Sequence, residues 1–106
     1  MPEPKAYSRL TRKLTVENLW LYVVKILLDK GEPMRAYDIK IELRERFGIN
    51  PPAITVYTAI YRMVRDGVLT RRQRGDEAVY TVSERGLEAF KKALVFMEEV
   101  LSKLKI

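Results

Sequence analysis

Cysteine and histidine are both missing from the 106 residues of this sequence. Without cysteine the chain has no disulfide, no thiolate metal site and no cysteine nucleophile. Without histidine it lacks the usual general base and the commonest neutral metal ligand. A carboxylate or lysine site is the remaining route to catalysis, yet the acidic residues are scattered over the polar sides of the expected helices. We therefore expect neither an enzyme nor a metal or cofactor site.

Long apolar runs are missing too. No run reaches the roughly 18 residues that a membrane-spanning helix requires, and the N-terminus has no short apolar core of the kind found in signal peptides. A cytoplasmic protein without membrane contact is therefore expected. The chain has a single glutamine and two asparagines, and 32% of its residues are charged, which resembles the composition of thermophile proteins.

Positive charge is in excess. The chain carries 20 Lys and Arg against 14 Asp and Glu, which gives a net charge of +6. Such a balance favours a polyanionic partner, although charge alone is equally compatible with general basicity. Because 47% of the residues are apolar, the chain is expected to fold as one domain, short enough for a partner subunit to complete its core.

The chain begins with a basic segment. Residues 1–14 contain two prolines and four basic side chains, and they fit either a disordered basic tail or a short extra helix. A helix over residues 15–30 is expected next, with Thr15 as its N-cap and a hydrophobic staple between Leu14 and Leu19. The glycine that follows would end this helix.

The helices expected over residues 15–30 and 36–47 differ in their apolar patterns. Residues 19–28 are apolar apart from Lys25, so one side of that helix should be covered by a second subunit. Residues 37–43 alternate between apolar and polar as a strand would, but the sequence LRERF and the glycine stop at Gly48 favour a helix over residues 36–47.

The helix after residue 49 has the best-defined start. Asn50 suits its N-cap and Pro51 its first position, and Ile49 and Ile54 again have the staple spacing. Gly67 ends it. At 100° per residue, one side is apolar and should face the core, and it holds Ala53, Val56, Tyr57, Ile60, Met63 and Val64. The opposite side is polar and basic, and it holds Thr55, Thr58, Arg62 and Arg65, with Tyr61 at its edge.

A basic β-hairpin follows. Residues 68–74 and 77–82 are expected to pair across the Gly75-Asp76 turn. The buried side of the hairpin should consist of Leu69, Tyr80 and Val82. The hairpin also carries three arginines, Arg71, Arg72 and Arg74. Because guanidinium groups are not buried without partners, these three should project into solvent or onto a ligand.

The last helix has a wide apolar stripe and begins after the N-cap Ser83. Its heptad positions are Leu87, Phe90, Leu94, Met97, Leu101 and Leu104. Val95, Phe96 and Val100 widen the stripe beyond what one small domain can cover. We therefore expect a dimer interface in which the heptad residues are joined by residues of the apolar first helix, namely Leu19, Trp20 and Val23.

Three helices, a basic hairpin and a long helix follow one another in the order typical of a winged helix-turn-helix protein. The predicted fold is therefore α+β, mostly α, with a three-helix core and a two-stranded wing. The winged-helix DNA-binding domain would span residues 15–83, and the C-terminal dimerisation helix residues 84–106.

Three short motifs resemble those of the PadR-like transcriptional regulators. MRAYDI is similar to that family's Gly-Tyr-x-Ile opening of the second helix, with Ala36 in place of the glycine. TVYTAIYRMVRDGVL resembles its Tyr-containing recognition helix ending in Gly-Leu, and YTVSERG resembles its Tyr-x-Leu-Thr-x-x-Gly after the wing. The resemblance extends over residues 19–89. It implies a dimeric DNA-binding repressor, with the third helix in the major groove and the wing on the adjacent backbone.

The residues expected to contact double-stranded DNA lie on the third helix and the wing. The two threonines would reach base edges or a thymine methyl group, the helix arginines flanking phosphates or a guanine, and the wing arginines the phosphate backbone or minor groove. The full set is Pro52, Thr55, Thr58, Tyr61, Arg62, Arg65, Arg71, Arg72 and Arg74.

A homodimer of this kind would place two recognition helices about 34 Å apart and would bind a palindromic site. Trp20 and Tyr22 are candidates for lining a small-molecule effector pocket at such an interface, although core packing is the simpler interpretation. A different hypothesis also stays open, in which the winged helix contacts another protein of the transcription machinery without specific DNA readout.

Overall fold

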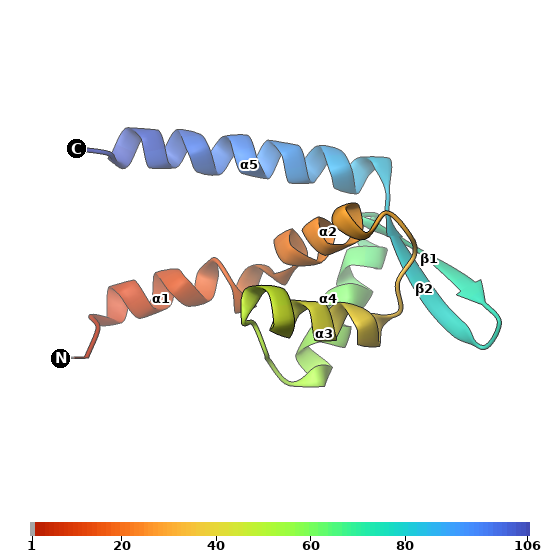
Figure 1. Cartoon of the computed structure of the whole chain (residues 1–106). Helices are drawn as coiled ribbons and strands as arrows, with labels where there is room; N and C mark the ends of the chain where they lie inside the picture. Colours follow the sequence, from red (N-terminus) through yellow and green to blue (C-terminus); the bar gives the residue numbers. More distant parts are fainter. Residues whose placement is uncertain (1) are drawn as a thin grey trace.

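The computed structural model describes residues 2–106, which form five α-helices, one 3₁₀ turn and one β-hairpin (Figure 1). The elements in chain order are α1 (Lys5–Lys13), η1 (Val16–Asn18), α2 (Leu19–Lys30), α3 (Ala36–Phe47), α4 (Ala53–Arg65), β1 (Leu69–Arg74), β2 (Glu77–Val82) and α5 (Glu84–Leu104). This is the predicted winged helix, mostly helical, with a long C-terminal helix. No helix among the described residues combines the length and the apolar character needed to cross a bilayer.

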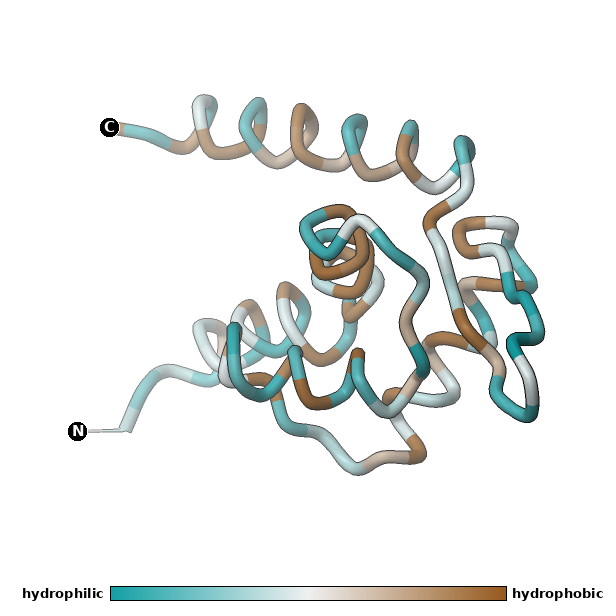
Figure 2. The backbone as a smooth tube through the Cα atoms, turned by 45° about the vertical axis from the view of Figure 1, so that its right-hand side comes forward, coloured by the Kyte–Doolittle hydropathy of each residue, from teal (hydrophilic) through white to brown (hydrophobic). Residues whose placement is uncertain are grey.

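The core lies where α2, α3 and α4 pack against one another and against the base of the wing. Each helix turns a stripe of apolar residues inward, because positions three and four apart share one face of a helix. The fully buried side chains are Val23, Val24, Ile26, Ile39, Leu43, Val56 and Ile60. Figure 2 shows these apolar stretches on the inner sides of the helices, while the tip of the wing is hydrophilic.

The predicted C-terminal ends of the helices agree with the structure better than the predicted N-terminal ends do. Gly31 and Gly48 adopt left-handed backbone conformations, with φ of 72° and 65°, and end α2 and α3. The expected N-cap at Asn50 is wrong, because α4 begins at Ala53 after Pro52. The staple between Ile49 and Ile54 is also wrong, since Ile49 is buried while Ile54 is exposed.

The N-terminal segment takes one of its two predicted forms, a short extra helix, whereas α2 begins differently from the prediction. Residues Lys5–Lys13 form the helix α1, in which no residue is buried. Thr15 does not cap α2, because its hydroxyl donates to the Thr11 carbonyl at 2.6 Å and the 3₁₀ turn η1 comes before α2. Leu19, the first residue of α2, is buried while Leu14 is exposed, so no staple forms there either.

The wing pairs in the predicted antiparallel register across Gly75-Asp76, with Leu69 opposite Val82 and Arg71 opposite Tyr80. Tyr80 and Val82 pack partly buried against the core, but the most buried residue of β2 is Val79, on the other face of the hairpin. An additional bridge between Met34 and Tyr80 ties the wing to the segment before α3.

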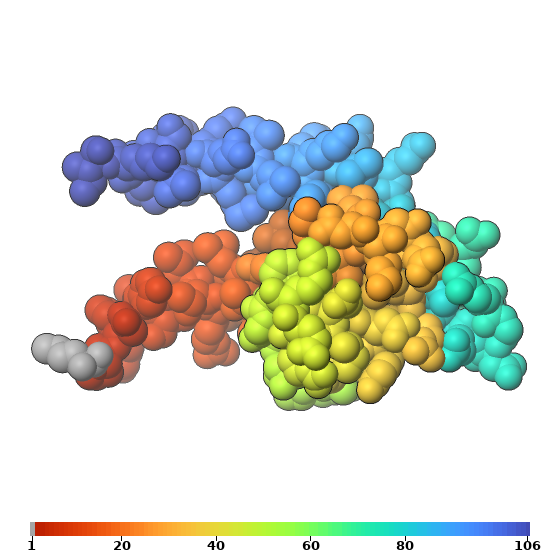
Figure 3. All heavy atoms as spheres, in the orientation of Figure 1, coloured from red at the N-terminus to blue at the C-terminus, as the bar shows by residue number. Residues whose placement is uncertain are grey.

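The junction between the wing and α5 is tightly packed. Ser83 accepts a hydrogen bond from the Gly86 amide at 2.9 Å, so it is the predicted N-cap of α5. A Cβ atom on Gly86 would lie 2.1 Å from the Val68 carbonyl oxygen, which means that only glycine fits this approach. Beyond this junction α5 extends away from the domain, and α1 projects to the same side with an open gap between them (Figures 1 and 3).

Candidate nucleic-acid interface

The outward face of α4 is more aromatic and apolar than its helical wheel predicts. Ile54 is 71% exposed, Tyr61 59% and Tyr57 40%. The prediction that Tyr57 faces the core is therefore wrong, and the true core residues of α4 are Val56, Ile60 and Met63. The wheel failed here because the apolar side of the helix is wider than the surface that α2 and α3 cover.

A broad hollow of about 760 Å³ runs along one flank of α4, between it, η1 and the beginning of α5. Thr55, Thr58 and Arg62 line this hollow together with Trp20 and Met63. The two threonines are half-buried, whereas Arg62 is exposed. Ile54 lines the same hollow, so the residues predicted to read bases stand next to the most exposed large apolar residue of α4.

A second hollow of about 470 Å³ separates the other flank of α4 from the wing, and it concentrates donors suited to an anion. Its lining residues are Tyr57, Tyr61, Val64, Arg65, Arg71 and Tyr80. The guanidinium carbon of Arg65 lies 5.9 Å from the centroid of the Tyr61 ring. Two guanidinium groups and three phenol hydroxyls around one hollow can donate hydrogen bonds to phosphate oxygens.

The three wing arginines do not share one face. Arg71 is on the same side of the hairpin as Leu69, while Arg72 and Arg74 point to the opposite side, because side chains alternate along a strand. Arg71 joins Arg65 at the hollow beside α4. Arg72 and Arg74 are exposed on the other side, so the hairpin presents positive charge on both faces.

Five arginines on α4 and β1, Arg62, Arg65, Arg71, Arg72 and Arg74, form what we call the arginine surface. Within residues 2–106 none of the five has a carboxylate within 4.0 Å. Arg74 stands opposite Glu77 in the hairpin register, yet Glu77 pairs with Arg35 at 2.9 Å. The arginine surface therefore keeps its full charge available for an external anion.

Arg35, which sequence reasoning missed, links the wing to the body of the domain. Its guanidinium binds Asp38 at 2.8 Å and Glu77 at 2.9 Å, which raises the pKa of Arg35 and lowers that of Asp38. A second ion pair of 2.7 Å joins Arg46 of α3 to Asp29 of α2, and it lowers the pKa of Asp29. The pairs Arg35–Glu77 and Arg46–Asp29 join residues far apart in the sequence, and the pair Arg35–Asp38 depends on where α3 begins. No local sequence motif therefore predicts these contacts.

The predicted dimer residues divide into two groups. Leu19 and Val23 are 3% and 0% exposed within the chain's own core, so their assignment to a subunit interface is wrong. Phe90 is also buried in that core, while Trp20, Leu87 and Met97 are half-buried. Leu94, Leu101 and Leu104 are exposed, as are Val95, Phe96 and Val100 on the same helix. Figure 2 shows apolar segments recurring along α5 out to its C-terminal end.

The exposed apolar residues of the outer half of α5 have a counterpart on α1. Tyr7, Leu10 and Leu14 are exposed at helical spacing, and we call them, together with Leu94, Val95, Phe96, Val100, Leu101 and Leu104, the α1–α5 face. Sequence reasoning placed no dimer contact in residues 1–14. The helical spacing of three apolar side chains in this segment was a signal that could have located this exposed apolar patch.

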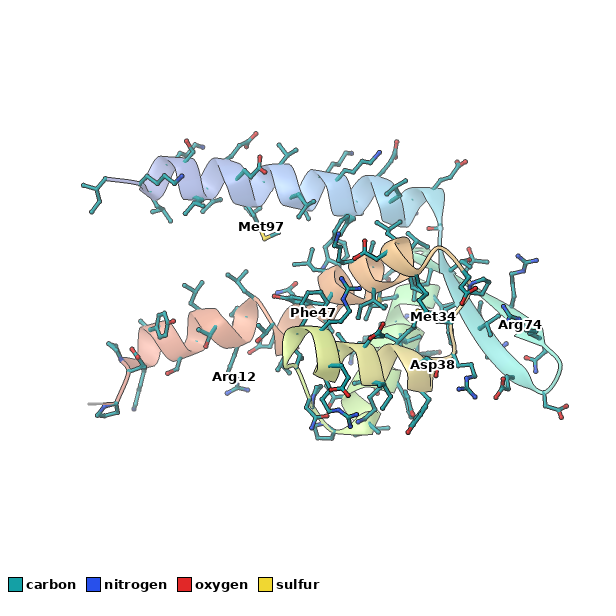
Figure 4. All side chains as sticks on the ribbon, in the orientation of Figure 1. Arg12, Met34, Asp38, Phe47, Arg74 and Met97 are labelled. Atoms are coloured by element: carbon teal, nitrogen blue, oxygen red, sulfur yellow. The ribbon has the colours of Figure 1, made fainter. Side chains whose placement is uncertain are left out.

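A third hollow, of about 370 Å³, lies at the inner end of the gap between α1 and α5. It is lined by Leu14, Leu21, Tyr22, Lys25, Phe47, Phe90, Leu94 and Met97. Figure 4 shows Met97 pointing from α5 towards the side on which Phe47 lies. The Tyr22 ring packs edge-on against Phe47 at 5.1 Å, and the Tyr22 hydroxyl donates to the Leu14 carbonyl. Trp20 lines the hollow beside α4 instead, so the two proposed effector-pocket aromatics are not brought together.

Several solved structures share this fold. The protein F93 from STIV, a winged-helix DNA-binding protein, superimposes with a TM-score of 0.69 at 21% identity, covering 81% of this chain and 92% of that one. A transcriptional regulator from Clostridium thermocellum gives a TM-score of 0.66 at 15% identity, with coverages of 82% and 89%. Bacillus subtilis PadR, solved in complex with operator DNA, gives 0.64 at 18% identity, with coverages of 76% and 49%.

Sequence comparison gives a family but no individual relative. No curated protein matches the chain. Structural similarity to PadR at this level of identity establishes the fold and leaves the PadR-like resemblance unconfirmed as a family assignment. The model of the PaaX-like protein family, in contrast, matches residues 21–86, which is more than half of the chain and includes α3, α4 and the wing. The chain belongs to the PaaX-like family.

Proposed function

We propose that this protein is a sequence-specific DNA-binding regulator of transcription. The observation that carries the proposal is the arginine surface, five guanidinium groups without carboxylate partners among residues 2–106, arranged on α4 and on both faces of the wing. α4 would enter the major groove and the wing would follow the adjacent backbone. Structural neighbours described as a winged-helix DNA-binding protein and a transcriptional regulator support this assignment.

The hollow between α4 and the wing is the proposed phosphate site. A DNA backbone that leaves the major groove beside α4 would pass the hollow that Arg65 and Arg71 line together with Tyr57, Tyr61 and Tyr80. Charge-assisted hydrogen bonds to phosphate oxygens are stronger than neutral ones, and they fix the position of a protein on the duplex without reading sequence. This site would set the register in which the outward face of α4 meets the bases.

The second part of the proposal is a homodimer that binds a palindromic site and acts as a repressor. Exposed apolar patches of this extent on a soluble domain mark interaction surfaces, and the α1–α5 face extends along both projecting helices. A two-fold dimer through these helices would present two copies of α4 about one DNA turn apart. Repression is proposed because the resemblance to PadR-like regulators implies it.

Selection of bound duplexes from a random pool tests the proposal. The full chain should enrich a palindrome whose half-sites are centred about 10 base pairs, or a multiple of one turn, apart. A non-palindromic enriched site would contradict the dimer while supporting the DNA-binding regulator. Failure to enrich any sequence, at salt concentrations where non-specific binding is weak, would contradict specific readout and favour the protein-contact hypothesis.

A further inference from the structure

Ile54 is an apolar side chain that its own chain leaves mostly exposed, at the edge of the hollow between α4 and η1. It is the second residue of α4 and is 71% exposed, although its neighbours Ile49 and Val56 are buried. The hydrophobic staple that its position suggests does not form. Its side chain instead stands at the leading end of the helix that carries Arg62 and Arg65 in its last turn.

The residues that share the outward ridge with Ile54 limit how the first turns of α4 can read DNA. Tyr57 and Tyr61 follow it on the exposed side, and Thr58 is half-buried at the edge of that side, so hydroxyl groups are the only polar groups next to Ile54 on these turns. Bidentate recognition of guanine or adenine requires arginine, lysine, asparagine or glutamine, and none of these stands there. Hydroxyl groups can contact any base and therefore discriminate little, so the selective contact available here is an apolar one, and in the major groove the apolar group is the C5 methyl of thymine.

Charge decides which partner covers this ridge. The arginine surface flanks it on both sides, since Arg62 lies at one hollow and Arg65 and Arg71 lie at the other. A second protein packed on Ile54 would have to bury these guanidinium groups or supply carboxylates for them, whereas a DNA duplex supplies phosphates on both sides of its major groove. The apolar ridge between two basic flanks therefore matches the methyl groups and phosphates of a duplex.

We infer that Ile54 contacts the C5 methyl group of a thymine and so specifies thymine at one position of each half-site. The inference rests on the proposed function, because it assumes that α4 lies in the major groove. It assigns a specificity residue that lies outside the predicted set of DNA contacts, beside Thr55 and Thr58, which line the same hollow as Ile54.

Deoxyuridine substitution tests the inference, because deoxyuridine differs from thymidine by the C5 methyl alone. The duplex selected by the full chain is remade with each thymine of one half-site replaced in turn, and dissociation constants are measured at one salt concentration. Burial of one methyl group corresponds to about a four-fold change in affinity. We expect one thymine position at which wild-type protein loses about four-fold, with smaller effects elsewhere.

The variants connect that position to Ile54. Ile54→Ser should bind the thymine and deoxyuridine duplexes equally, whereas Ile54→Val, which keeps a branched apolar side chain, should retain the preference. Ile106→Ser makes the same change at an exposed position outside the helices and should behave as wild type. Circular dichroism of each variant verifies that the exposed substitution leaves the fold intact.

Three outcomes would overturn the inference. If wild type tolerates deoxyuridine at every position of a strongly bound duplex, or if Ile54→Ser keeps the thymine preference unchanged, Ile54 does not read a methyl group and the regulator proposal still stands. If no duplex is enriched at all, the proposed function fails and the inference fails with it.

Discussion

The arginine surface and the α1–α5 face are both exposed, but they differ in how favourably water solvates them. A guanidinium group without a partner is well solvated, so the arginine surface is stable when free and can bind and release an anion. Burying the exposed leucines and aromatic residues of the α1–α5 face against a matching apolar surface would lower the free energy. The proposed DNA contact on α4 and the wing should therefore be reversible and salt-dependent, and the proposed subunit contact on α1 and α5 lasting and insensitive to salt.

The largest effect should come from removing the wing's charge. In a dimer that neutralises about eight phosphates, log affinity falls with log salt at a slope of about −7. Replacing Arg71, Arg72 and Arg74 by Ala removes up to six of these contacts, so the slope should flatten by about 5 and affinity at low salt should fall on the order of 1,000-fold. Binding titrations across a salt series measure both quantities.

The control for the wing is the basic helix α1. Replacing Arg9, Arg12 and Lys13 by Ala removes the same charge at the other end of the molecule, where Figure 4 shows Arg12 far from Arg74. This variant should keep a slope close to that of wild type. Equal flattening in both variants would mean that binding follows net charge alone, and an unchanged slope in the wing variant would contradict the wing assignment.

A smaller effect is expected from charging the α1–α5 face. Leu101→Glu puts a carboxylate where a second copy of the chain would bury a leucine, so it should weaken self-association by about 100-fold and should weaken binding to the palindrome as a consequence. Sedimentation velocity over a concentration series measures the change. Ser102→Glu, one residue along the same exposed turn, is the matched control. Two variants that both remain dimers, or a wild-type chain that is monomeric at micromolar concentration, would contradict the proposed interface.

The smallest effect concerns the ion pairs through which Arg35 links the wing to the start of α3. Arg35 lowers the pKa of Asp38 below its ordinary value of 3.8. A carboxyl group with a lowered folded pKa stabilises the fold above its unfolded pKa, and this contribution is lost as the pH falls through the folded pKa. The Tm of wild type should therefore exceed that of Asp38→Asn by a few degrees at most at neutral pH. The difference in Tm should disappear once the pH lies below the folded pKa of Asp38.

The same two proteins give a functional readout of that link. Asp38→Asn leaves the arginine surface intact, so any loss of DNA affinity would come from a less firmly held wing. The control is Glu42→Gln, which alters a carboxylate of the same helix that forms no ion pair among the described residues. A Tm difference between wild type and Asp38→Asn that persists unchanged into acid would show that Asp38 acts through its shape and not through its charge.

Much of the fold could be predicted because its elements are marked locally. Gly31 and Gly48 end helices since glycine accepts positive φ, and the Gly75-Asp76 dipeptide sets the hairpin register. Helix starts were predicted less well. Asn50 and Thr15 have the right side chains for N-caps, but Pro51-Pro52 delays α4 and the 3₁₀ turn η1 displaces the beginning of α2.

Part of the site could be predicted as well. Alternation along β1 and the turn at Gly75-Asp76 placed arginines in solvent, since a charged group cannot be buried without a partner. Which arginines stay unpaired was not visible, because the pairing of Glu77 with Arg35 joins residues 42 apart in the chain. Likewise Val23 and Leu101 both belong to apolar stripes, and only the packing of the whole chain shows that one is core and the other surface.

The sequence by itself determined the order of the elements, the side of each helix that is apolar and the excess of positive charge on α4 and the wing. Only the tertiary structure decided which parts of those apolar sides are covered, and so turned Ile54 and Tyr57 outward while it buried Leu19 and Val23. The physical reason is that periodicity depends on a residue's own helix, whereas burial depends on the neighbouring elements that the chain brings against it.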